Sequence, residues 1–242
     1  MTLEIFDAKG ALVRRYVSGE KKPERARPLP VAERWLPQPV SLDTAAGMHR
    51  FVWDLRWDDS GQSEDLEEDE YSAPRGPRVA PGKYQLKLVT PGGTLSESLE
   101  VQMDPRSKAT ADELAEQQRL GLEIYGEALR SAKALAEAKA AYASLKKLAM
   151  RLKGQPQLQA QAEKLLAEIG SIVQGLEAAN GGLQSVLRVV ESGDRTTPQQ
   201  ALEVYRLSQT AAKTQIAEWE KLKTGILSQF NGKVKTLGKL PD

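Results

Sequence analysis

Residues 101–113 read VQMDPRSKATADE, and the character of the chain changes within this stretch. Most of the prolines and three of the four tryptophans precede it. Long runs of Ala, Leu, Gln, Glu and Lys follow it, and these residues lose the least free energy on entering a helix. The change in composition predicts a β domain over residues 1–104 and an α-helical domain over residues 105–242.

The α domain begins with a helix-starting motif. In Thr110-Ala111-Asp112-Glu113, the Thr hydroxyl and the Glu carboxylate can each accept a hydrogen bond from a free backbone amide, which makes a capping box. Apolar residues then recur at steps of three and four as far as residue 152. We expect a second helix to end at Asn180-Gly181-Gly182, a short third helix over 183–191, and a long final helix capped at Thr197-Pro198. The prediction is an antiparallel helical bundle.

The β domain is predicted from alternation of apolar and polar residues. Leu3 and Ile5 share a face, Asp7-Ala8-Lys9-Gly10 has the residues of a tight turn, and residues 11–17 resume an extended pattern. A second pair of strands flanks Pro91-Gly92-Gly93. About five short strands can be counted, and a small antiparallel immunoglobulin-like sandwich fits them.

Residues 51–58, FVWDLRWD, show the clearest alternation in the chain and are expected to form its best strand. Trp53 and Trp57 fall on the apolar face, so burial in the core explains them better than stacking on a sugar. Asp54 and Arg56 fall on the opposite, polar face. These two residues are candidates for contact with a ligand or with the other domain.

The overall composition excludes several classes of function. The formal net charge is +1, far from the strongly basic balance of a dedicated nucleic-acid binder. With no cysteine and one histidine, thiolate chemistry, zinc fingers and multi-histidine metal centres are excluded or nearly so. Neither a targeting segment nor a run of about 18 apolar residues is visible. We therefore expect no cofactor, no nucleic acid and no membrane as partners.

Two further places could carry a site. Residues 58–70 are rich in carboxylates, but they lack the spacing of a calcium loop, and a solvated acidic loop is the favoured interpretation. His49, the only imidazole, precedes the expected strand and lies near Asp43 in the sequence, so a bond to a loop is more plausible than catalysis. Trp35 is isolated among prolines and is the aromatic residue best placed for a ligand or for the other domain.

Several stretches of the chain resemble one known family. The stretches TLEIFDAKG (residues 2–10), GMHRFVWDLR (47–56) and APGKY (80–84) resemble the region that follows the β-propeller in bacterial sortilin-like BNR-repeat proteins, which often carry the label glycosyl hydrolase. Residues 185–194 and 198–205 are similar to the helical tail of the same proteins. The resemblance implies an immunoglobulin-like sandwich followed by helices, and it covers nearly the whole chain.

The propeller, where a glycosidase site would lie in that family, is absent from this sequence, so the resemblance transfers no catalytic residue. The strand that would precede the first hairpin is also missing, and we expect the chain to be a fragment or a truncated gene product. The leading hypothesis is a non-catalytic accessory module that docks onto an upstream β-propeller or another protein surface. The alternatives are a part of a glycoside hydrolase and a carbohydrate- or protein-binding module. The localisation stays open, although the resemblance implies exported parent proteins.

Overall fold

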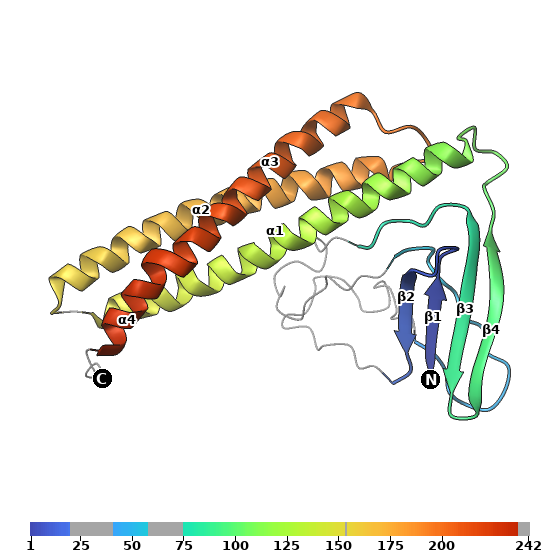
Figure 1. The fold of residues 1–242 in the computed structure, drawn as a ribbon, viewed down its shortest axis with the longest axis horizontal. Helices are drawn as coiled ribbons and strands as arrows, with labels where there is room; N and C mark the ends of the chain where they lie inside the picture. Colours follow the sequence, from blue (N-terminus) through green and yellow to red (C-terminus); the bar gives the residue numbers. More distant parts are fainter. Residues whose placement is uncertain (20–40, 58–74, 153, 237–242) are drawn as a thin grey trace, which may run out of the picture. The chain divides into compact units, whose positions relative to one another are not determined.

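The computed structural model describes residues 1–19, 41–57, 75–152 and 154–236. Four antiparallel strands precede three long helices, so the predicted order of β and then α structure is confirmed (Figure 1). The chain forms two compact units. Unit 1 comprises Met1–Leu122 with Val190–Thr197, and unit 2 comprises Glu123–Val189 with Pro198–Asp242.

The first hairpin of unit 1 is the predicted one. Strands β1 (Thr2–Phe6) and β2 (Leu12–Val17) pair antiparallel across a turn that begins at Asp7. An Asp7 carboxylate oxygen accepts hydrogen bonds from the backbone amides of Lys9 and Ala11, at 2.9 and 2.8 Å. Gly10 has φ 82°, a left-handed conformation that glycine adopts without steric cost. The turn chemistry therefore fixes the register of this hairpin.

The second predicted hairpin is also confirmed, and it completes a single sheet. Strands β3 (Gly82–Thr90) and β4 (Gly93–Val101) pair over nine residues each, and β3 also pairs with β1. The strand order is β2-β1-β3-β4, which places β2 and β4 at the two edges. Ile5 and Tyr84 lie buried on the same face of this sheet.

Irregular chain covers that face in place of the expected strand. Residues 51–57 form only an isolated bridge, Arg56 with Arg78, so the expectation of a strand there is wrong. The alternation breaks at Leu55, whose φ of 57° lies in the left-handed region and whose side chain is 41% exposed. Trp53 nevertheless packs on the core as predicted, and its ring meets that of Tyr84 edge to face.

The other face of the sheet carries a buried carboxylate. Glu4 lies centrally on β1, where its carboxylate accepts hydrogen bonds from the Arg15 guanidinium of β2, the shorter at 2.6 Å, and pairs with Lys87 of β3 at 3.3 Å. The Arg15 hydrogen bond is the main cause that lowers the pKa of Glu4, and Lys87 adds to it. One ionised side chain thus links three strands.

This arrangement makes unit 1 sensitive to acid through Glu4. Because folding lowers the Glu4 pKa, its contribution to stability is complete above the ordinary glutamate value, about 4.3, and is lost as the pH falls through the lower folded value. We expect Glu4→Gln to unfold more readily than the wild type at pH 7 and to lose less stability between neutral and acid pH. Denaturant titrations of both proteins at several pH values give the change in unfolding free energy with pH for each. If the two proteins lost stability equally as the pH fell, Glu4 would not be the source of the acid sensitivity.

The N-terminal cap predicted for the first long helix is confirmed, and the cap predicted for the last one is wrong. Helix α1 (Ala111–Arg151) is preceded by the capping box, in which Thr110 Oγ1 accepts from the Glu113 amide at 3.2 Å and Glu113 accepts from the Thr110 amide at 2.8 Å. Helix α2 (Pro156–Val190) follows Gly154, whose φ is 97°. Helix α3 (Gln199–Leu222) has Pro198 at its N-cap with no side-chain cap, so the predicted Thr197 cap is wrong.

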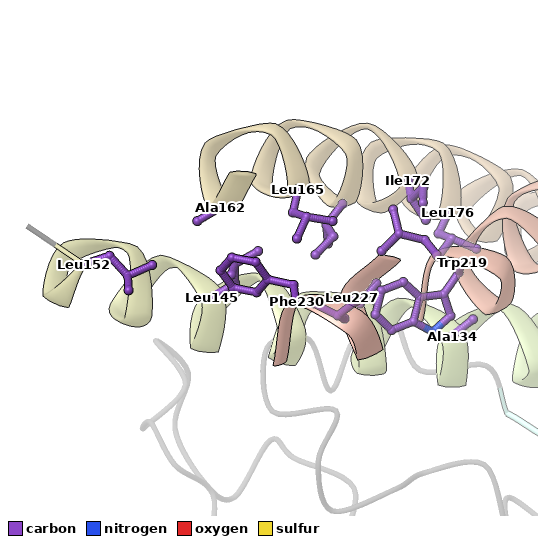
Figure 2. Close-up of a cluster of buried hydrophobic side chains, with 13 residues drawn as sticks. Ala134, Leu145, Leu152, Ala162, Leu165, Ile172, Leu176, Trp219, Leu227 and Phe230 are labelled. Carbon is purple, nitrogen blue, oxygen red and sulfur yellow. The ribbon is translucent and has the colours of Figure 1, made fainter. Parts of the chain in front are cut away.

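Unit 2 is built on the parts of these helices from residue 123 onward. A five-residue π-helical turn, η2 (Lys223–Leu227), continues α3 into α4 (Ser228–Thr236). Side chains from α1, α2 and the α3 to α4 segment meet in one apolar core, where Leu145, Leu176 and Trp219 have at most 4% of their surface exposed (Figure 2). No helix in the part of the chain that the structure describes is long and apolar enough to cross a membrane.

Helix α2 runs unbroken through Asn180-Gly181-Gly182, so the predicted stop and the separate short helix are wrong. Neither glycine takes a positive φ. A Cβ on Gly182 would lie 2.3 Å from Ser208 Oγ and 3.1 Å from Ser208 Cβ, on α3. About two helical turns earlier, a Cβ on Gly175 would lie 2.6 Å from a side-chain carbon of Gln215. Gly182 lets α2 approach Ser208 of α3 closely, and Gly175 leaves room for the flexible end of the Gln215 side chain.

Gly181 and Gly182 provide a matched pair for testing this explanation. We expect Gly182→Ala to destabilise unit 2 by about 1–2 kcal/mol, because overpacking outweighs the gain in helix propensity. Gly181→Ala should stabilise it by up to about 1 kcal/mol, since a Cβ there meets nothing within 4 Å. Urea unfolding followed by circular dichroism at 222 nm measures both. If Gly182→Ala were stabilising, the helices would not pack as described. Adding Ser208→Ala to Gly182→Ala should restore part of the lost stability, because it removes the hydroxyl that the new Cβ meets.

Candidate functional site

A cavity with a volume of about 390 Å³ lies within unit 1. Three parts of the chain line it: residues 54–56 and 77–81 with the end of β4, the first turns of α1, and the connector that follows α2. Its apolar wall includes Val101, Met103 and Leu114. Its polar wall carries four carboxylates and two guanidiniums, those of Asp54, Asp104, Glu191, Asp194, Arg56 and Arg78.

An ion pair between Arg56 and Glu191 forms the centre of the polar wall. Arg56 Nη1 lies 3.0 and 3.1 Å from the two Glu191 carboxylate oxygens, and it also donates to the Gly76 carbonyl at 2.8 Å. The Arg78 backbone amide donates to Glu191 at 2.7 Å. Both charged side chains are mostly buried, 17% and 15% exposed. Glu191 thus joins the connector after α2 to two segments of the β part of unit 1.

Two neighbouring glutamines of α1 complete this network. The Gln117 side-chain amide donates to the backbone carbonyls of Val190 and Gly193, the latter at 2.8 Å. The Gln118 side-chain oxygen accepts from the Ala80 amide. Because consecutive residues of a helix point in different directions, α1 bonds the connector with one side chain and the β part with the next. The polar atoms of both side chains are thus bonded to backbone groups of other segments of unit 1.

Two carboxyls, those of Asp104 in the cavity wall and of Glu113 at the start of α1, have lowered pKa values. The Arg106 guanidinium, which meets Asp104 at 2.6 Å, lowers the pKa of Asp104. The Thr110 amide, followed by the Thr196 hydroxyl, lowers the pKa of Glu113. A general acid at neutral pH needs the opposite shift, a carboxyl pKa raised by burial or by a like charge. These carboxylates are therefore suited to structural bonding.

The structure places the site residues predicted from the sequence in different parts of the chain. Arg56 and Asp54 both line the cavity, and Asp54 accepts from the Arg56 backbone amide at 3.3 Å. His49 is separate from them: its Nδ1 lies 3.2 Å from the Asp43 carboxylate and its Nε2 lies 2.8 Å from the Ala45 carbonyl. The expected bond between His49 and a loop is present. Trp35 lies outside the described residues.

The acidic run of residues 58–70 also lies outside the described residues. In the ranges that are described, no three His, Cys, Asp or Glu side chains gather so as to hold a metal ion.

Sequence reasoning missed Glu191, Arg78, Gln117 and Gln118. Arg56 and Glu191 are 135 residues apart, so no spacing in the sequence relates them. Gln117 and Gln118 follow the capping box like any pair of exposed helix residues. Only the fold brings these side chains to one wall, and the sequence offered no signal for it.

A second group of polar side chains lies in unit 2, between α1 and α3. The Tyr205 hydroxyl donates to Glu123 at 2.8 Å, and the Gln209 amide donates to Glu127 at 3.1 Å. Burial, followed by the bond to Glu123, raises the pKa of Tyr205. Each pair spans 82 residues, which shows that α1 and α3 run parallel and in register. The Gln209 amide also donates to the Tyr205 hydroxyl at 2.9 Å, so these groups bond to one another.

Comparison with known proteins adds no identification, because no protein-family model, no curated protein and no solved structure matches this chain.

Proposed function

We propose that this chain is a non-catalytic accessory module, which docks onto another protein and contributes no reacting groups. One observation carries the proposal: the two least exposed charged side chains that line the unit 1 cavity bond to each other and to backbone groups. Arg56 and Glu191 spend their hydrogen bonds on each other and on the backbone of residues 76 and 78. Because these atoms are already bonded within the protein, they are not available to bind or protonate a substrate.

The resemblance to the region after the propeller in sortilin-like BNR-repeat proteins supports the same function. A β part followed by helices fits a segment that buttresses a propeller. For the finer architecture, we propose an immunoglobulin-like sandwich in which the irregular residues 42–57 take the place of a strand over the core face of the sheet, and an antiparallel helical bundle. A propeller or another protein surface is the proposed partner.

An assay of the whole chain on aryl glycosides tests the non-catalytic assignment. We expect no release of the aryl group above the rate in buffer. Turnover that Glu191→Gln or Asp194→Asn abolishes, in protein that remains folded by circular dichroism, would overturn the proposal. Turnover that persists unchanged in both variants and varies between preparations would indicate a contaminating glycosidase.

A further inference from the structure

The outer edge of β4 is the most open element of the sheet. Strand β4 is the last in the order β2-β1-β3-β4, and no strand in the part of the chain that the structure describes pairs with its outer side. All nine of its residues align with β3 without a bulge, and β4 contains no proline, lysine or arginine. Leu95, which lies opposite Leu88, is 66% exposed. An edge of this kind offers a row of backbone donors and acceptors to another strand.

The opposite edge, β2, differs from β4 in the features that discourage pairing. It has six residues, its register with β1 shifts between Ile5 and Phe6, and it carries Arg14 and Arg15. Short length, an irregular register and basic residues protect β2, whereas β4 has the single inward-facing charge of Glu97. The two edges of one sheet are therefore unequal, and pairing with another chain is favoured at β4.

The charges on β4 indicate which strand would fit. By its pairing with β3, Glu97 lies opposite Leu86 on the core face of the sheet, between Leu95 and Leu99. Glu100 lies on the other face, opposite Lys83. A strand placed beside β4 must accommodate the Glu97 carboxylate within an apolar row. A basic residue opposite it supplies an attractive cross-strand pair, whereas an acidic residue would repel it.

The charge of Glu97 also disfavours the β4 strand of a second copy of this chain as the strand that pairs with β4. When two β4 strands pair antiparallel so that Leu95 of each faces Leu99 of the other, the two Glu97 side chains stand directly opposite. Like charges in that position destabilise a strand pair.

We propose that the outer edge of β4 docks a β-strand of a partner protein, with apolar residues beside Leu95 and Leu99 and a basic residue beside Glu97. Main-chain hydrogen bonds provide the affinity in this mode of recognition, and the side chains provide the specificity. The inference rests on the proposed accessory function and names the contact through which the module would dock.

The experiment uses the full chain and two blocked peptides, Thr-Val-Thr-Lys-Thr-Val-Thr and the same sequence with Glu in place of Lys. Hydrogen exchange by NMR reports on the β4 amides. At equal concentration, we expect the Lys peptide to slow exchange of the outward-pointing amides by about tenfold, which is about 1.4 kcal/mol of protection, and the Glu peptide to leave them unchanged.

Two variants on the same strand provide a matched control. Glu97→Lys should reverse the preference between the peptides, and Glu100→Lys should leave it unchanged, because Glu100 lies on the other face. Protection by neither peptide, or an unchanged preference in Glu97→Lys, would overturn the inference. A free chain that sediments as a dimer with these amides already protected would also overturn it, in favour of a second copy. Failure here leaves the glycoside assay, and with it the non-catalytic assignment, unaffected.

Discussion

Glu191→Ala is expected to lower the free energy of unfolding of unit 1 by about 2–4 kcal/mol, since it leaves a mostly buried guanidinium without its counter-ion. The side chains of Arg56 and Glu191 are 17% and 15% exposed, so water can replace little of what is lost. The substitution also removes the acceptor of the Arg78 amide, which is exposed and can bond to water instead.

Two other variants separate the charge from the hydrogen bonds. Glu191→Gln keeps an oxygen that can accept from the Arg78 amide and loses the charge, so we expect an intermediate loss. Glu203→Ala removes an exposed glutamate of α3 and should change stability by no more than about 0.5 kcal/mol. Hydrogen exchange of residues 76–80 and 190–197 locates the effect. If Glu191→Ala matched Glu203→Ala, the ion pair would not be holding these segments together.

Local chemistry explains why parts of this fold could be predicted. The turn at Asp7 and the capping box at Thr110 and Glu113 each depend on bonds between residues at most four positions apart. Period-two alternation predicted β1 and β3 because both strands bury one face of the sheet and leave the other face polar. Such signals are complete within a few residues of sequence.

The failures arise where a distant residue decides the local conformation. Gly181-Gly182 resembles a helix end, yet the contact with Ser208 makes Gly182 a packing residue within a continuous helix. Residues 51–57 alternate like a strand, but the left-handed turn at Leu55 carries Arg56 to Glu191. The candidate site depends on that contact across 135 residues. Sequence reasoning named Arg56 and Asp54 but could not supply their partners.

Trp219→Ala is expected to destabilise unit 2 by about 3–5 kcal/mol, which is the usual loss when a large aromatic side chain is removed from a core. Trp219 is 1% exposed and lies among Leu176, Leu227 and Ala134, side chains from three segments (Figure 2). Its Nε1 also donates to the Glu137 carboxylate at 3.2 Å, and the Lys223 ammonium lies 5.8 Å from the ring centroid. The substitution therefore removes the packing, the hydrogen bond and the cation–π contact of Trp219 at once.

Trp219→Phe distinguishes these contributions. A phenyl ring fills most of the cavity but cannot donate to Glu137, so we expect a loss smaller than that of Trp219→Ala, with Glu137 still held by Lys223 at 2.8 Å. Ile226→Ala is the control, because Ile226 is 55% exposed and its truncation should cost well under 1 kcal/mol. Urea unfolding at 222 nm measures all three. Equal losses for Trp219→Ala and Ile226→Ala would mean that the three helices do not share the core that Trp219 fills.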